Sequence, residues 1–118
     1  MPFLHLETTA DLPENADVPD ILEALAAILA DQDSVEPRKV RAYHSLRSVW
    51  VMGEGGPAGF AHLTGYVARG RSVEWRAGLS KQLAEVLKEH FGGSLTEKGA
   101  AVSVEIREIE PESYIRLE

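Results

Sequence analysis

The chain has 118 residues, no cysteine and a formal net charge of −7. This length fits one domain, residues 1–118, that can bury a core, and the acidic balance argues against nucleic acids and anionic membranes, which attract basic surfaces. The lack of cysteine excludes disulfide and thiolate chemistry, no window approaches 18 apolar residues and no signal peptide is visible, so a cytoplasmic protein is expected.

The first half of the chain predicts a strand, a helix and a second strand. The first strand is expected over 2–8. A helix is expected over 17–31, with Asp17 as its N-cap. A long strand rich in β-branched and aromatic residues should follow over about 39–52, and the glycine-rich segment 53–57 should form a turn.

The second half predicts the same order of elements. A strand is expected over 60–68. Ser72 is a suitable N-cap for a second helix, with His90 in its last turn and Gly92 as its C-terminal stop. The alternation of apolar and polar residues over 101–109 predicts a last strand.

An internal repeat links the two halves. Residues 3–6 match residues 60–63, and the helical segment 21–29 matches 79–87 at nearly the same offset. We interpret the chain as a duplicated βαβ unit, with repeats at 1–58 and 59–118.

Two βαβ units predict the fold class. Each unit gives a parallel strand pair, so we expect an α+β (α/β) fold: a four-stranded mixed sheet with two helices on one face. Parallel strands are usually covered on both faces, so the open face should meet another subunit. The apolar C-terminal tail, with Tyr114, Ile115 and Leu117, is also expected to pack against something.

The histidines and the familiar motifs give little chemistry. The sequence has no phosphate-binding loop, dinucleotide fingerprint, zinc-protease motif or nucleophile elbow. His5 and His62 occupy equivalent repeat positions, which favours a structural role, while His44 is ambiguous. No histidine spacing suggests a metal site, and none is predicted.

Pro2 is the first candidate for chemistry. It could simply be a proline tolerated at the start of a strand. If Met1 is removed, however, Pro2 becomes a secondary amine at the N-terminus. The ordinary pKa of an α-amino group is about 7.7–8.0, and burial or nearby cations lower it. Such a group is suited to proton abstraction next to a carbonyl.

Three arginines could accompany this amine. Arg41 lies early in the second strand, and Arg69 and Arg71 flank a glycine just after the third. Arginine suits bidentate binding of carboxylates, and strand ends often contact ligands. A pocket with Arg41, Arg71 and Pro2 would be locally positive in an acidic protein.

Together these features resemble a family. Pro2 behind Met1, the repeated βαβ unit, Arg41 after Pro37, and residues 60–64 leading to Gly70-Arg71-Ser72 are similar to the tautomerase superfamily. The branch that the chain most resembles is the 5-carboxymethyl-2-hydroxymuconate delta-isomerases, and the similarity covers nearly the whole chain.

The resemblance implies a tautomerase-like homotrimer that needs no cofactor and no metal. It implies an isomerase of aromatic compound catabolism that transposes a C=C bond in a 2-hydroxymuconate-type dienol diacid. Pro2 would be the general base that shuttles the proton between carbons of the dienol. Arg41 and Arg71 would hold the substrate carboxylate and polarise its carbonyl or enol oxygen.

The resemblance also suggests a substrate-binding set. Phe3 and Trp50 would be apolar walls. From its place after the third strand, Arg69 is also expected to bind substrate, as is Tyr43 in the second strand. Tyr43 departs from the family pattern, which has a basic residue at this position, so the carboxylate-binding set should differ in detail.

Two other functions fit parts of the pattern. One is a non-catalytic module that binds small anions on the same scaffold, with Met1 retained. The other is a ferredoxin-like regulatory domain, which shares the βαββαβ order but has a split βαβ arrangement.

Overall fold

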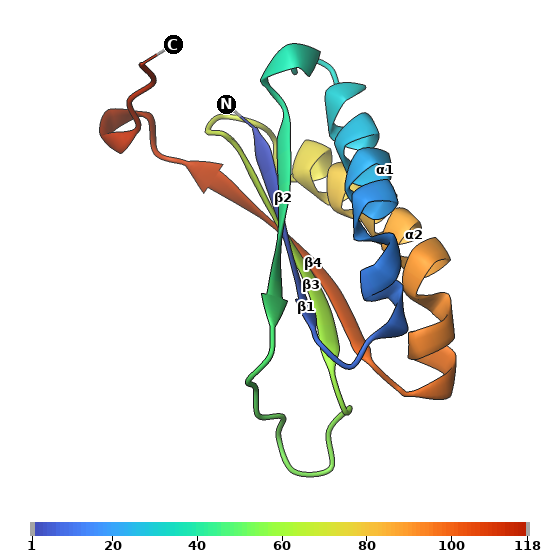
Figure 1. The fold of residues 1–118 in the computed structure, drawn as a ribbon. Coiled ribbons are helices and arrows are strands. Elements are labelled where there is room, and N and C mark those ends of the chain that lie inside the picture. Colours follow the sequence, from blue (N-terminus) through green and yellow to red (C-terminus); the bar gives the residue numbers. More distant parts are fainter. Residues whose placement is uncertain (1, 118) are drawn as a thin grey trace.

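The computed structural model describes residues 2–117. Four strands and two helices follow one another in the expected order (Figure 1). Their bounds are β1 Phe3–Thr9, α1 Val18–Ala30, β2 Arg41–Arg47, β3 Phe60–Ala68, α2 Val73–Glu97 and β4 Ala101–Ile109. There are also three short 3-10 turns in the described residues. The turn η1 Pro13–Asp17 precedes α1, η2 Pro37–Lys39 precedes β2, and η3 Pro111–Ser113 follows β4.

The strands form one mixed sheet in the order β2-β1-β3-β4. The pairs β1–β2 and β3–β4 are parallel, and the central pair β1–β3 is antiparallel. Both helices lie on the same face of the sheet (Figure 1). The expected fold class is confirmed, and because β1 and β2 are direct neighbours, the split βαβ arrangement of a ferredoxin-like domain is absent.

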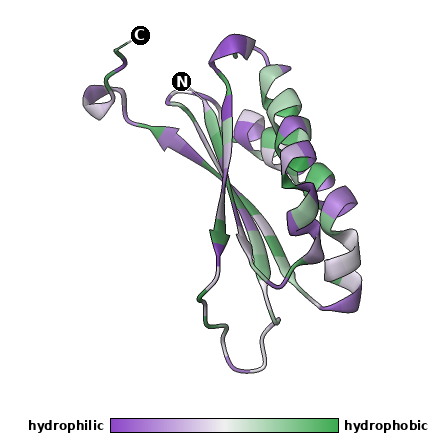
Figure 2. Cartoon of the chain, viewed as in Figure 1, coloured by the Kyte–Doolittle hydropathy of each residue, from purple (hydrophilic) through white to green (hydrophobic). Residues whose placement is uncertain are grey.

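The core lies between the sheet and the helices. In Figure 2 hydrophobic residues gather on the surfaces where the two layers meet. Alternate strand residues and helix residues three or four apart turn toward this layer, which matches the strand and helix periods. The largest fully buried side chains include Leu4, Leu6, Leu63, Val67, Ile21, Leu25, Leu79, Leu83, Leu87 and Phe91.

The predicted bounds are right for β3 and β4 but too long for β2. The strand ends at Arg47, not near residue 52. Its only strand neighbour, β1, ends at Thr9, which pairs with Arg47, so the ladder has no partner beyond that point. Val49 and Val51 are accordingly 90% and 94% exposed in a loop that extends away from the sheet (Figure 1).

Helix α2 is longer than predicted. The Ser72 hydroxyl accepts a hydrogen bond from the Trp75 N–H, which confirms the N-cap. The helix does not stop at Gly92 but runs to Glu97, so His90 is not in its last turn. Phe91 and Ser94 are buried, and burial outweighs the roughly 1 kcal/mol that a helical glycine costs. Gly99, with φ of +61°, follows the end.

The helix extension is also held by a contact from η1. The Ser94 hydroxyl donates to Glu14 Oε1 at 2.6 Å, and the Ser94 N–H approaches Glu14 Oε2 at 3.3 Å. By contrast, the Asp17 side chain makes no capping hydrogen bond at the start of α1. The start of that helix therefore depends on η1 and on burial of Val18 rather than on a capping side chain.

The C-terminal tail does not pack as expected within this chain. Ile115 and Leu117 are 81% and 98% exposed, and the tail projects from the body in Figure 1.

Neither helix within residues 2–117 combines the length and the hydropathy that a membrane-spanning segment needs.

Candidate active site

Pro2 lines a cavity of about 170 Å³ at the start of β1. Its walls come from four places in the chain: the loop after α1, η2, the end of β3 with the turn that follows, and the tail. The lining residues are Pro2, Ser34, Val35, Glu36, Lys39, Val67, Ala68, Arg71 and Arg116. Sheet pairing brings these segments together, because Phe3, next to Pro2, lies opposite Arg41 of β2 and Tyr66 of β3.

Arg71 is fixed at the cavity by several contacts. Its guanidinium donates to the backbone carbonyls of Asp33 at 3.1 Å and Ser34 at 3.2 Å. It also lies over the Trp75 ring, 4.1 Å from the centroid, in cation–π geometry. The structure thus brings Arg71 together with Pro2 as the sequence predicted.

The backbone at Ser34 is unusual. Its φ is +66°, the one positive value at a non-glycine residue in the part of the chain that the structure describes. Such a conformation is uncommon for a side-chain-bearing residue and costs energy. The conformation places the Ser34 carbonyl where Arg71 reaches it.

Arg41 lies beside the Pro2 cavity rather than in its wall. Its backbone N–H donates to the Pro2 carbonyl at 3.3 Å. Its side chain lines a neighbouring hollow of about 420 Å³ together with Arg38, Lys39 and Arg116. Because Lys39 and Arg116 line both spaces, the hollow adjoins the cavity of Pro2.

A third hollow, of about 460 Å³, also adjoins the Pro2 cavity. It shares Ser34, Ala68 and Arg71 with the Pro2 cavity and is also lined by Arg69 and Trp75. The Pro2 cavity therefore shares lining residues with two hollows, and each of these has arginine side chains in its wall.

Besides Arg41, four of the predicted site residues do not line the Pro2 cavity. Phe3 is in ring contact with Tyr66 at 5.0 Å, and Tyr43 stacks on His5 at 4.6 Å. Arg69 contacts the carboxylates of Glu112 and Glu110 at 3.4 and 3.7 Å.

Trp50 lies far from Pro2 within this chain. Its indole N–H donates to the Ala58 carbonyl at 3.0 Å, inside the loop that joins β2 to β3. Figure 1 shows this loop at the opposite end of the sheet from the N-terminus.

Lys39 and Arg116 are the cavity residues that sequence reasoning missed. A signal existed for Lys39, because three basic residues fall within 38–41, just before the expected second strand. Arg116 gave no comparable signal, since its place depends on where the tail leaves β4.

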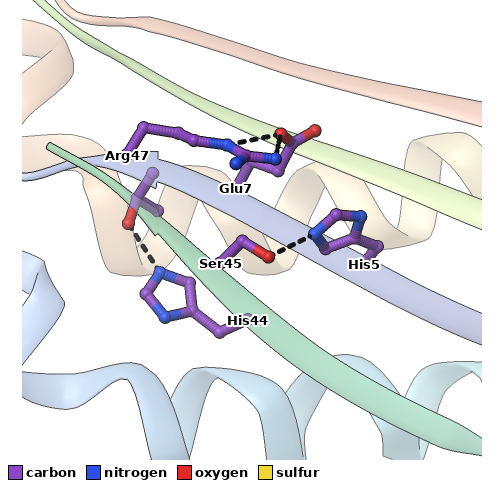
Figure 3. A network of polar contacts seen from close by, with 6 residues as sticks. His5, Glu7, His44, Ser45 and Arg47 are labelled. Atoms are coloured by element: carbon purple, nitrogen blue, oxygen red, sulfur yellow. Dashed lines mark hydrogen bonds and ion pairs between the residues drawn. The ribbon is translucent and has the colours of Figure 1, made fainter. Parts of the chain in front are cut away.

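Three of the four histidines make side-chain hydrogen bonds, and Figure 3 shows His5 and His44. His5 Nε2 lies 2.8 Å from Ser45 Oγ, and His62 Nδ1 lies 2.7 Å from Ser103 Oγ. His44, on the helix side of β2, contacts the buried Thr8 hydroxyl at 2.7 Å, and burial followed by the charge of His5 lowers the pKa of His44. Among the described residues, no cluster of three or more histidine and carboxylate side chains could hold a metal.

Two comparisons with known sequences give the same family. Residues 2–117 match the model of a family described as 5-carboxymethyl-2-hydroxymuconate isomerase. The chain is 28% identical over 112 residues to the 5-carboxymethyl-2-hydroxymuconate Delta-isomerase of Escherichia coli, a match that covers 94% of this chain and 89% of that protein.

Solved structures extend the comparison. A 5-carboxymethyl-2-hydroxymuconate isomerase from Deinococcus radiodurans R1 has a TM-score of 0.88 and 29% identity, over 98% of this chain and 87% of that one. The Q0 fused 4-OT wild-type symmetric trimer has a TM-score of 0.74 and 23% identity, over 98% of this chain and 92% of that one, and so shares the fold.

Proposed function

Because this chain belongs to the 5-carboxymethyl-2-hydroxymuconate isomerase family and is an isomerase, we propose that it converts a 2-hydroxymuconate-type dienol diacid to its keto isomer. The reaction uses no cofactor and serves the breakdown of aromatic compounds in the cytoplasm. The observation that carries the proposal is the cavity in which Pro2 is surrounded by Lys39, Arg71 and Arg116.

Pro2 is the base in this proposal, after removal of Met1. The neutral secondary amine takes the proton of the enol hydroxyl, which leaves a dienolate. The resulting ammonium returns a proton to a carbon of the diene, so that a C–H bond and a C=O bond form while the C=C bond moves. Lys39, Arg71 and Arg116 disfavour the protonated amine, because like charges repel. The Glu36 carboxylate in the same cavity has the opposite effect, which its ion pairs with Arg38 and Lys39 limit.

Arg71 and Arg41 bind and polarise the substrate. Arg71 is held in place before substrate arrives by two carbonyls and the Trp75 ring. A fixed cation near the enol oxygen stabilises the negative charge of the dienolate without reorganising during the reaction. Arg41 lies next to Pro2 across the β1–β2 pair and faces the neighbouring basic hollow.

We also propose a homotrimer. The sheet face opposite the helices carries partly buried side chains such as Phe3, His5 and Tyr66, and no part of residues 2–117 covers it. Val49, Val51, Ile115 and Leu117 are exposed apolar residues that a neighbouring copy could bury. A related fold is described as a symmetric trimer. Light scattering should give three times the 12.9 kDa chain mass, and a monomer would contradict the assembly.

The experiment compares wild type with Pro2→Ala, after intact-mass measurement has confirmed the loss of Met1. We expect enol-to-keto conversion of 2-hydroxymuconate and phenylenolpyruvate to fall by about 100-fold or more, the usual contribution of a general base. Pro19→Ala, an exposed proline in the first turn of α1, is the matched control and should keep full activity. Equal turnover by wild type and Pro2→Ala would refute Pro2 as the base, and full retention of Met1 in the native host would favour an anion-binding module.

A further inference from the structure

The hollow beside the Pro2 cavity is lined by basic residues alone. Its wall consists of Arg38, Lys39, Arg41 and Arg116. The whole chain has a net charge of −7, so this concentration of positive charge is a local exception. A concave surface with charge of one sign attracts and holds ligands of the opposite sign.

Size indicates that this hollow and the Pro2 cavity act together. The Pro2 cavity has about 170 Å³, whereas ligand pockets usually have about 300–1,000 Å³. Lys39 and Arg116 form the boundary between the two spaces. A ligand whose reacting atoms lie at Pro2 can therefore extend past these two residues into the basic hollow.

The charge of Lys39 is partly balanced by Glu36. Lys39 Nζ lies 2.8 Å from Glu36 Oε2, and Arg38 Nε lies 2.6 Å from Glu36 Oε1. These hydrogen bonds, from Lys39 first and then Arg38, lower the pKa of Glu36 to about 2. Surface ion pairs of this kind contribute little net energy, so a ligand carboxylate can compete with Glu36 for Lys39.

The position of Arg116 depends on contacts that fix the strand and turn before the tail. Gly70 N–H donates to Glu108 Oε2 at 2.9 Å, and Arg69 contacts Glu110 and Glu112. These contacts tie the end of β4 and η3 to the turn that carries Arg71. The tail leaves from this anchored point, and Arg116 reaches the cavity that Arg71 lines from another side.

We infer that the basic hollow is a second anion subsite, in which Lys39 and Arg116 bind the substrate carboxylate remote from the reacting enol. The inference rests on the proposed function and adds two specificity-determining residues to it. The C-terminal tail is then part of the substrate site, and an enol acid with a second carboxylate is preferred over one that has a single carboxylate.

The kinetic test compares kcat/KM for 2-hydroxymuconate, which has two carboxylates, with that for phenylenolpyruvate, which has one. Arg116→Gln and Lys39→Gln should each lower the value for the diacid by about 10- to 100-fold, as expected for loss of a charge-assisted hydrogen bond. Lys39 and Arg116 also line the Pro2 cavity, so the monoacid reports any general effect on the base, and its value should fall at least about tenfold less than that of the diacid. The loss should appear mainly as a higher KM, because the remote carboxylate is bound equally in the ground and transition states.

Matched variants distinguish the effect of losing a positive charge in the basic hollow from the effect of losing one elsewhere on the protein surface. Arg116→Lys keeps the cation and should recover much of the preference for the diacid. Lys81→Gln removes the same charge from an exposed position on α2 and should leave both substrates unaffected. The inference is overturned if Arg116→Gln and Lys39→Gln leave the ratio between the two substrates unchanged or lower both values equally.

A binding measurement separates this inference from the proposed function. Muconate and sorbate share a six-carbon diene, have two carboxylates and one carboxylate respectively, and lack the hydroxyl needed for ketonisation. Wild type should bind muconate more tightly in calorimetric titration, and Arg116→Gln should remove the difference. Equal affinities in wild type overturn the subsite even if Pro2 proves catalytic, while a preference for muconate in an inactive chain supports the subsite alone.

Discussion

Removing the aromatic ring beneath Arg71 should weaken catalysis without removing any group that contacts the substrate. The Arg71 guanidinium lies 4.1 Å from the centroid of the Trp75 ring. Cation–π pairs contribute about 0.5–1 kcal/mol at exposed sites and about 2 kcal/mol when desolvated. Arg71 and Trp75 are both partly buried, so about 1 kcal/mol is expected. Two backbone carbonyls still hold Arg71, which limits the loss.

In Trp75→Leu the value of kcat/KM for 2-hydroxymuconate should therefore fall about fivefold, since 1.4 kcal/mol corresponds to a factor of about ten. Trp75→Phe keeps an aromatic face and should lose less than about twofold. Both variants remove part of an apolar contact with the core, so circular dichroism and urea midpoints must first show that each is folded at the assay temperature.

The comparison between the two variants decides the outcome. Loss of packing alone would lower kcat/KM of Trp75→Leu and Trp75→Phe in proportion to the apolar area that each removes. It would also lower the urea midpoint. Loss of cation–π positioning appears in kcat/KM of the leucine variant alone. Equal kcat/KM for the two folded variants would refute the claim that the Trp75 ring positions Arg71.

Two further predictions concern the buried contact between β1 and β2. Thr8→Val removes the hydroxyl that donates to Asn15 Oδ1 and contacts His44 Nε2. The free energy of unfolding should fall by about 2–3 kcal/mol, as measured by urea unfolding at fixed protein concentration. A decrease below about 0.5 kcal/mol would contradict this prediction. Burial lowers the pKa of His44 below its ordinary 6.5, so the unfolded chain binds the proton first. The stability that comes from burying neutral His44 is therefore complete above pH 6.5. It is lost as the pH falls toward the lower pKa of His44 in the folded state. His44→Gln should lose less stability than wild type between pH 7.5 and 5.5, and parallel pH profiles would contradict this assignment.

Local sequence patterns predicted the elements whose limits are set locally. The bounds of β3 and β4 follow from alternation and flanking turns, and the start of α2 follows from the Ser72 cap. The end of α2 was missed because burial of Phe91 and the contact between Ser94 and Glu14 join residues that are far apart in sequence. A glycine such as Gly92 predicts a helix end from local sequence alone, and it carries no information about contacts between distant residues.

The candidate site also has residues that local sequence patterns predict and residues that they do not. Pro2 and Arg71 could be paired from sequence because each lies at the end of a strand whose neighbours follow from the βαβ topology. Arg116 could not, since its position depends on where the chain leaves β4 and on the ion pairs of Arg69 with Glu110 and Glu112. Residues that belong to strands are predictable here, and a residue delivered by a tail is not.

The two ends of the central strand pair differ in the space that they leave for a ligand. Pro2 and Gly59 make the same backbone contact, because the Pro2 carbonyl accepts from Arg41 N–H and the Gly59 carbonyl accepts from Ala101 N–H. Gly59, however, has no room beside it: a Cβ atom would lie within 2.5 Å of the Asp11 carboxylate and would also collide with the Thr9 hydroxyl. At Pro2 the corresponding space is a cavity with basic walls. Similar strand geometry thus leaves a filled space beside the Asp11 carboxylate at Gly59 and an open cavity with basic walls at Pro2. The proposed function places the anionic substrate at the open end.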